Sequence, residues 1–325
     1  MIVVLHGTVP PDAPKDEQDT LVEAREVSEA LGRLGYEPYP LSCSLDLRHL
    51  ADSLAKLRPE AVFNLVESLE GKGQLIHLAP SVLDHMGLSY TGSSAEALFL
   101  TSNKLVAKTL LEKAGVPTPP WMTPEVLQKG PLPFGPPYIV KSVWEHASVG
   151  LDEDSVIWDE RALLQELSRK KARYGGKWFV EAYIEGREFN LSLLESENGP
   201  LILPPAEILF EGYGPGKIRV VGYRAKWEEE SFEYNHTPRT FSFPDRDKPL
   251  LRRLSDLAAL CWALFDLRGY ARVDFRVDAA GNPWVLEVNA NPCLTLGGGF
   301  ASAAEQGGFS YDRLIEQILK SCLPP

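Results

Sequence analysis

Two short segments decide the fold of this chain: residues 271–277, Ala-Arg-Val-Asp-Phe-Arg-Val, and residues 284–289, Trp-Val-Leu-Glu-Val-Asn. In both segments apolar and polar residues alternate, and the turn-forming stretch Asp-Ala-Ala-Gly-Asn at 278–282 separates them. A period of two with a turn between predicts an antiparallel hairpin with one apolar face. That face is expected to hold Val273, Phe275, Val277, Trp284, Leu286 and Val288.

The other face of the predicted hairpin carries the chemistry. With the turn near Ala280, Asp274 lies almost opposite Glu287, and Arg272 lies opposite Asn289. Like charges across a strand pair are destabilising unless something positive lies between them. Two carboxylates and an amide oxygen are hard ligands that suit Mg²⁺. The pattern favours a metal site formed by Asp274, Glu287 and Asn289; a solvent-facing pair of polar strands is the alternative.

Beyond the hairpin, residues 291–300 end in three glycines, Gly297, Gly298 and Gly299. Free backbone N–H groups in such a run can bind an anion. The run lacks the Gly-Lys-Ser/Thr ending of a P-loop, so an ordinary flexible connection to the next helix remains open.

Three lysines precede the hairpin at positions suited to polyphosphate. Lys141 ends an apolar strand and begins the small-residue segment 141–150, and Lys104 lies on a helix predicted over 93–114. Lys226 lies on a predicted loop after the glycine-rich stretch 212–216. Each lysine, taken alone, is also consistent with a solvated surface charge.

Residues 178–190 join two apolar strands through an acidic turn. Such a segment could link two lobes, with its backbone against a purine and a carboxylate on the ribose hydroxyls. An ordinary charged hairpin is the alternative.

The first ninety residues alternate strand and helix patterns, with strands near 2–5 and 61–66 and a helix over 21–34. This alternation predicts a parallel, doubly wound sheet. Proline clusters at 117–120 and 131–137 mark plausible boundaries. We expect three units: an N-terminal α/β substrate domain at 1–94, a central lobe at 95–183 and a C-terminal catalytic lobe at 184–325.

Composition narrows the class of protein. The chain has 325 residues, of which 44% are hydrophobic and 24% charged, as in a folded globular protein. A net charge of −12 argues against nucleic acid as a partner. No apolar run is long enough to span a membrane, no signal peptide is evident, and the four cysteines are scattered. We therefore expect a cytoplasmic protein without a membrane partner.

Four segments, in this order, resemble the ATP-grasp superfamily and its D-alanine–D-alanine ligase branch. They are residues 90–93 with 103–104, 140–150, 180–189, and 272–292. The resemblance covers nearly the whole chain. It implies an α/β fold in which a parallel-sheet domain precedes two α+β ATP-grasp lobes that hold ATP between them.

The resemblance also implies roles for individual residues. Asp274, Glu287 and Asn289 match the Mg²⁺ ligands, and Arg272 matches the cation at the reacting carboxyl group. Residues that would contact ATP are Lys104 and Lys141 at the phosphates, Glu181, Tyr183 and Ile184 at adenine, Glu188 at ribose, Lys226 over the γ-phosphate and Ser148 near the transferred phosphoryl group.

These roles describe a ligase that activates a carboxylate as an acyl-phosphate, which an amine then attacks. Lysines and Mg²⁺ offset the phosphoryl charge, and Arg272 would stabilise the oxyanion. We expect amino acids or a peptide-like acceptor as substrates. An ATP-dependent kinase on the same fold is a second hypothesis, and a nucleotide-binding protein without turnover is a third.

Substrate recognition is where the sequence departs from the family. Glu67 stands near the family's usual histidine, and Gly298, beside Gly299, replaces a serine that grips the terminal carboxylate. Glu17 loosely matches a glutamate that holds an amino group. We expect Glu67 to favour a cationic substrate and the pair not to be two D-alanines, although a true D-alanine–D-alanine ligase remains the alternative. Relatives suggest a homodimer.

Overall fold

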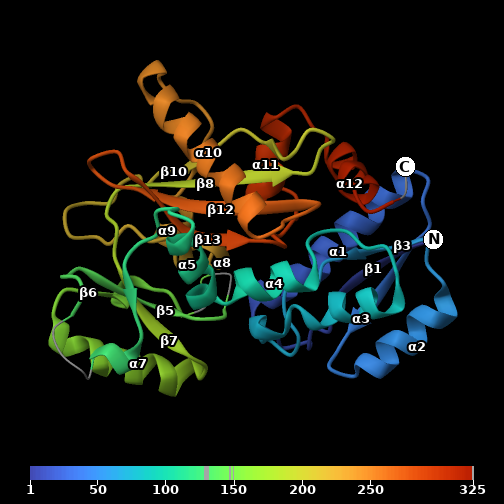
Figure 1. Ribbon diagram of the computed structural model, residues 1–325, viewed down its shortest axis with the longest axis horizontal. Coiled ribbons are helices and arrows are strands. Elements are labelled where there is room, and N and C mark those ends of the chain that lie inside the picture. Colours follow the sequence, from blue (N-terminus) through green and yellow to red (C-terminus); the bar gives the residue numbers. More distant parts are fainter. Residues whose placement is uncertain (128–131, 146–147, 149, 324–325) are drawn as a thin grey trace.

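The computed structural model describes residues 1–127, 132–145, 148 and 150–323, which form three sheets flanked by helices (Figure 1). The expected mixed α/β architecture with a parallel N-terminal sheet is confirmed. Residues 146, 147 and 149, part of the segment expected beside the phosphates, lie outside the described residues. No helix in the described part of the chain is long and apolar enough to cross a bilayer.

The N-terminal sheet is parallel in the order β2-β1-β3. Because side chains alternate across β1, Ile2 and Val4 pack on one face while Val3 and Leu5 pack on the other. The first face is covered by α1 (Lys15–Arg33) and by the last helix, α12 (Tyr311–Lys320). The remaining elements are β1 (Ile2–Gly7), β2 (Pro38–Cys43), α2 (Leu47–Leu57), β3 (Ala61–Asn64), η1 (Gly73–Leu75) and α3 (Leu78–Met86).

The central sheet is antiparallel in the order β4-β7-β5-β6. One face is covered by α7 (Glu160–Tyr174), whose Leu163 and Leu167 pack against Val140 and Val180. Its elements are β4 (Trp121–Met122), α6 (Pro124–Leu127), β5 (Tyr138–Ser142), η2 (Glu153–Ser155), β6 (Val156–Ile157) and β7 (Trp178–Ala182).

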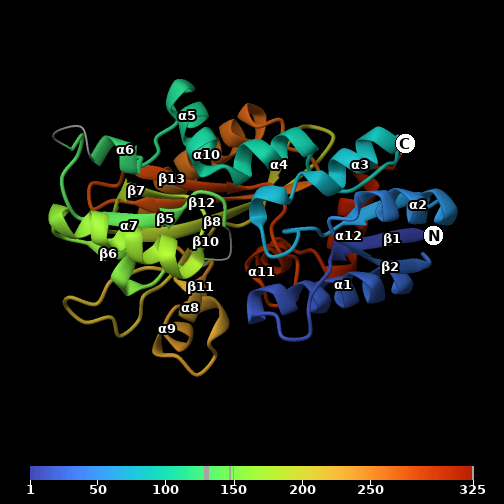
Figure 2. The ribbon, with the colours of Figure 1, turned by 90° about the horizontal axis from the view of Figure 1, so that it is seen from below.

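The C-terminal sheet follows the order β11-β10-β8-β12-β13, with β9 paired to β8. Figures 1 and 2 show it beside the central sheet, with α5 and α10 on its outer face. Its strands are β8 (Arg187–Leu194), β9 (Leu201–Ile202), β10 (Ala206–Ile208), β11 (Arg239–Thr240), β12 (Tyr270–Val277) and β13 (Pro283–Asn289). The accompanying helices are α8 (Tyr223–Trp227), α9 (Phe232–Asn235), η3 (Asp245–Asp247), α10 (Lys248–Leu264) and α11 (Gly299–Gln306).

The β12–β13 hairpin pairs Asp274 with Glu287 and Arg272 with Asn289, as the sequence predicts. The expected apolar face is wrong in its second strand. After the pair at Asp274, the partner of Phe275 is Val285, so Leu286 is an extra residue in a β-bulge. The bulge turns Val285 into the core, whereas Trp284 and Leu286 are only half-buried.

The single helix predicted over 93–114 is also wrong, because the structure has two helices there. α4 (Ala95–Ser102) and α5 (Lys104–Lys113) meet at Asn103, whose backbone is extended. The Asn103 side chain caps α5 by accepting hydrogen bonds from the N–H groups of Leu105 and Val106. Because the helix is interrupted at Asn103, Lys104 begins a new helix, and its ammonium group reaches the carbonyl oxygen of Glu145.

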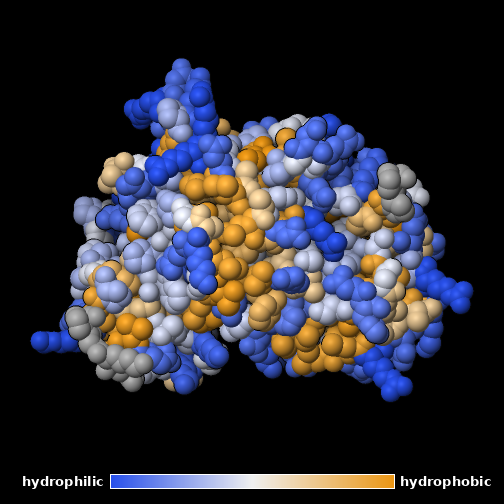
Figure 3. All heavy atoms as spheres, in the orientation of Figure 1, coloured by the Kyte–Doolittle hydropathy of each residue, from blue (hydrophilic) through white to orange (hydrophobic). Residues whose placement is uncertain are grey.

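Each sheet lies within one of the three predicted units, although α4 and α5 pack onto the C-terminal sheet. The acidic turn at 183–186 joins β7 of the central sheet to β8 of the C-terminal sheet, so it links two lobes rather than closing a hairpin. Hydrophobic residues form a band across the middle of the face in Figure 3, whereas hydrophilic residues cover the projecting end of α10.

Candidate active site

The hairpin presents its polar residues where the lobes meet. Arg272 makes two hydrogen bonds to Asp274, from Nε to Oδ1 at 2.7 Å and from Nη2 to Oδ2 at 2.8 Å. Asn190 on β8 also donates to Asp274 Oδ1, at 2.8 Å. Lys104 Nζ lies 3.5 Å from Glu287 Oε2. The carboxylate oxygens of Asp274 and Glu287 suit Mg²⁺, and nearby cations offset their charge in the structure itself. The amide oxygen of Asn289 accepts the Asn291 N–H at 3.1 Å.

Lys104 and Lys141 lie on two different elements, and Lys104 reaches the hairpin at Glu287. Lys104 begins α5, and its Nζ donates to the carbonyl oxygen of Glu145 at 2.6 Å. Lys141 on β5 donates to Glu181 Oε1 at 2.7 Å. Both lysines are largely buried, so they are not the solvated surface charges that the sequence left open.

Glu181 is buried on β7 between two ammonium groups. Besides Lys141, it pairs with Lys108, whose Nζ lies 2.5 Å from Glu181 Oε2. Burial raises the pKa of Glu181, but the two lysines outweigh this effect and hold it below the usual value. Sequence reasoning missed Lys108; the one available signal was a lysine on the apolar face of its helix, four residues after Lys104.

The linker residues 183–188 are held by Arg276, a second residue that sequence reasoning missed. Arg276 pairs with Glu188 Oε2 at 2.8 Å and donates to the carbonyl oxygens of Gly186 and Arg219. The Tyr183 hydroxyl donates to the same Arg219 oxygen at 3.0 Å. Ile184 is half-buried beside them. The expected adenine and ribose residues therefore share one ordered segment.

Lys226 lies on the short helix α8, not on the loop that the sequence predicts. Residues 223–227, which follow Gly222, contain no glycine, so the backbone there can form a short helix. Burial and the nearby Arg272 lower the pKa of Lys226, while Asp274 and Glu287 act in the opposite direction. The Ser148 hydroxyl donates to the carbonyl oxygen of Val221 at 2.8 Å, which attaches the central lobe to the start of α8.

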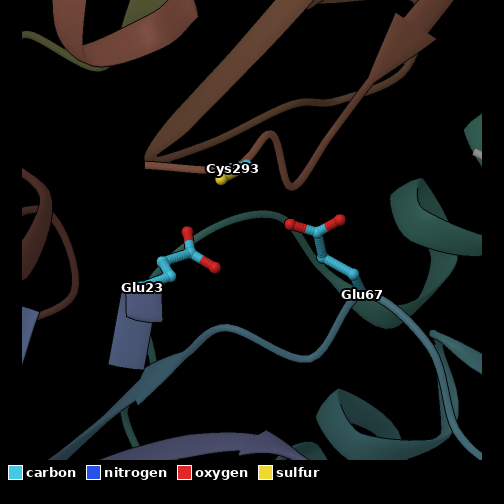
Figure 4. Close-up of side chains that lie close together, drawn as sticks. All are labelled: Glu23, Glu67 and Cys293. Carbon is cyan, nitrogen blue, oxygen red and sulfur yellow. The ribbon is translucent and has the colours of Figure 1, made fainter. Parts of the chain in front are cut away.

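Glu67, Glu23 and Cys293 lie close together (Figure 4). They come from the loop after β3, from α1 and from the loop after β13, and one ligand atom of each lies within 4.8 Å of the others. Burial and the charge of Asp19 raise the pKa of Glu67 to about 7, although Arg272 lowers it. Burial and Glu67 also raise the pKa of Glu23.

This cluster is a poor metal site despite its donor atoms. The Cys293 thiol lies 3.1 Å from Asp19 Oδ2, and burial raises the pKa of that thiol, which favours its protonated form. Glu23 Oε1 already accepts the N–H of Leu294 at 2.6 Å. A protonated thiol and a backbone-bonded carboxylate bind metals weakly. The cluster is better suited to an organic cation.

The remaining predicted substrate residues surround the same region. Glu17 lies against the loop after β3. Its Oε1 is so close to Gly71 that a Cβ added at this glycine would lie only 2.9 Å from it. Gly298 caps α11 and Gly299 begins it, so the glycine run starts a helix instead of a loose connection. Arg239, unpredicted from sequence, donates to the Gly297 carbonyl oxygen at 3.0 Å.

Comparison with known proteins agrees with this geometry. A family model described as the D-ala D-ala ligase C-terminus matches residues 110–320. The chain is 32% identical to protein y4sG of Sinorhizobium fredii, over 91% of this chain and 86% of that protein. It is 30% identical to the D-alanine–D-alanine ligase of Thermotoga maritima, over 94% and 93% of the two chains.

The fold is also similar to that of a solved structure. The D-alanine–D-alanine ligase from Bacillus anthracis complexed with ATP superposes with a TM-score of 0.74 at 22% identity, covering 99% of this chain and 97% of the other. The arrangement of the three sheets and this similarity show an ATP-grasp fold. Within that class, the chain belongs to the D-alanine–D-alanine ligase family.

Proposed function

We propose that this protein joins a carboxylate to an amine through an acyl-phosphate, with amino acids or a peptide-like acceptor as substrates. Membership of the family makes the chain an ATP-dependent, amide-forming ligase that uses ATP and Mg²⁺. The observation that carries the proposal is the pairing of Asp274 with Glu287 beside Arg272, Lys104 and Lys226.

The chain's own residues divide the work at this site. Asp274, Glu287 and Asn289 would hold Mg²⁺, which neutralises phosphate charge when bound. Lys104, Lys141 and Lys226 would bind the phosphate oxygens and orient the γ-phosphate toward the substrate carboxylate.

Arg272 would then stabilise the negative oxygen that forms when the amine attacks. The contact of Ser148 with the segment before α8 would help α8 to exclude water, which otherwise hydrolyses the activated acid.

Adenine and ribose would lie along the linker between the two lobes. Glu181, Tyr183 and Ile184 would border the base, and Glu188 would accept hydrogen bonds from the ribose hydroxyls. Arg276 supports this arrangement because it orients Glu188 and fixes Gly186 in the same segment.

The substrate would carry a positive charge into the space between Glu67 and Glu23. Two carboxylates whose pKa values are both raised gain free energy when a cation allows them to ionise. Glu17 would assist from the adjacent loop. Gly299 leaves room beside Arg239, because a Cβ there would lie 3.8 Å from the Arg239 Nε, whereas a Cβ at Gly298 would meet the Thr295 carbonyl oxygen at 2.7 Å. Arg239 would bind the acceptor's carboxylate in place of a serine hydroxyl.

ADP release from Mg-ATP, with products identified by mass spectrometry, tests both the activity and the substrate. Separate reactions contain D-alanine, pooled neutral D-amino acids, pooled neutral L-amino acids, and the basic amino acids of each hand. We expect a condensed product that contains a basic component. D-alanyl-D-alanine as the main product would give this protein the activity for which its relatives are named, and it would refute the proposal that Glu67 binds a cationic substrate.

Three further expectations accompany this function. We propose domain boundaries near 94 and 183, where the chain passes between sheets. A cytoplasmic location would supply ATP and keep the four free cysteines reduced. A homodimer would be recognised by sedimentation, and a monomer would contradict it.

A further inference from the structure

Lys108 is a buried cation that touches neither the predicted metal ligands nor the proposed substrate cluster. Its side chain is 2% exposed, and its Nζ pairs with Glu181 and donates to Thr118 Oγ1 at 2.7 Å and to the Pro119 oxygen at 3.3 Å. Burying a lysine is costly unless it is paired and hydrogen-bonded. Because Glu181, Thr118 and Pro119 all contact the ammonium group, we expect this buried lysine to have a specific role.

The direct partners of Lys108 all lie within residues 95–183, and one of them, Thr118, also reaches the C-terminal sheet. Thr118 Oγ1 donates to the carbonyl oxygen of Val285, two residues before Glu287 on the metal strand. Glu181 lies on β7 and contacts Lys141 through its other oxygen. Through Thr118, Lys108 is therefore connected to β13, the strand that carries Glu287. Through Glu181, it is connected to Lys141.

The charge balance explains why a second lysine is needed at Glu181. If Lys141 were its sole partner, the carboxylate would cancel the charge that Lys141 offers to phosphate. With Lys108 on the second oxygen, two positive charges face one negative charge, and a net positive charge remains. Glu181 can then orient Lys141 without neutralising it.

We infer that Lys108 is a positioning residue that keeps the charge of Lys141 available to the phosphates of the bound nucleotide. This inference rests on the proposed function, in which Lys141 contacts those phosphates. Lys108 should therefore strengthen the binding of a nucleotide more as its number of phosphates increases. It should not affect the binding of the nucleoside.

Calorimetric affinities for Mg-ATP, Mg-ADP and adenosine test the inference on the full chain. In Lys108→Met, we expect the ratio of ATP to adenosine affinity to fall roughly ten- to hundredfold, the range for losing one charged interaction in a partly buried site. Lys108→Arg should keep most of the ratio. Lys113→Met, which removes an exposed lysine from the same helix, is the matched control and should leave it unchanged.

Changing Glu181 separates charge balance from simple structural support. Glu181→Gln should raise the ATP-to-adenosine ratio, and the double variant Lys108→Met with Glu181→Gln should return it close to the wild-type value. These two variants also decide the matter if Lys108→Met does not fold. Equal weakening of ATP and adenosine, or no recovery in the double variant, would overturn the inference. Wild-type protein that binds adenosine and ATP equally would instead refute the proposed phosphate site.

Discussion

Replacing Glu67 by glutamine should stabilise the folded protein at alkaline pH. Burial and the nearby Asp19 raise the pKa of Glu67 from 4.5 to about 7. Between these two values the folded chain binds a proton that the unfolded chain has released, so wild-type stability falls as pH rises. Below pH 4.5 the carboxyl group is protonated in both states and costs nothing. Above pH 7 the folded state carries the full penalty.

The size of the penalty follows from the two pKa values. A separation from 4.5 to about 7 corresponds to about 3 kcal/mol of unfolding free energy. Glutamine has nearly the same shape and cannot ionise, so Glu67→Gln should lack this penalty. We expect the difference in unfolding free energy between variant and wild type to shift by about 3 kcal/mol in favour of the variant between pH 4.5 and pH 8. Most of this change should occur between pH 5 and 7.

Urea denaturation of both proteins at half-unit steps from pH 4.5 to 8 measures this gain. Glu70→Gln is the matched control, because Glu70 lies in the same loop but is exposed beside Lys72. A stability difference that does not vary with pH would refute the electrostatic account of Glu67. The same variant should lose about ten- to hundredfold in kcat/KM for a cationic substrate, since one charged hydrogen bond is removed.

Three further perturbations test other parts of the structure. Asp274→Asn should reduce ATP turnover more than about a hundredfold with an unchanged circular dichroism spectrum, and retained turnover would contradict the metal assignment. Removing divalent cations with EDTA should abolish ADP release, and added Mg²⁺ should restore it; turnover that survives chelation would count against the same site. Lys170→Met should lower the unfolding free energy by about 3 kcal/mol or more, because it leaves Asp152 and Glu166 without their buried partner, whereas Lys171→Met on the exposed face should be near neutral.

The hairpin that carries the proposed metal ligands was predictable because a local pattern encodes it. Period-two alternation located β12 and β13, and a turn position sufficed to set Asp274 opposite Glu287. The same reasoning placed Leu286 in the core, where the structure has Val285. A bulge shifts the register by one residue without changing the composition of the strand, so alternation alone cannot reveal it.

The contacts of α1 and α5 were not predictable in the same way. Glu23 and Lys108 lie on helical faces that the apolar pattern assigns to the core. Their partners, Leu294 and Glu181, are distant in sequence and approach only through the packing of separate lobes. Side chains of this kind become interpretable when the tertiary arrangement is known.

The distribution of charge across the reacting centre gives the strongest constraint on the substrate. On the side proposed to bind the nucleotide, Lys104 lies beside Glu287 and Lys141 beside Glu181. Lys226 is close enough to Asp274 and Arg272 to interact with their charges. On the other side, the buried or half-buried groups are carboxylates, with Glu67 and Glu23 facing one space. Under the proposed function, a substrate that spans the two sides would offer a negative group to Arg272 and a positive group to Glu67, as an amino acid does. One ammonium group would offset one carboxylate, and we propose that the second carboxylate favours a substrate with an additional cation.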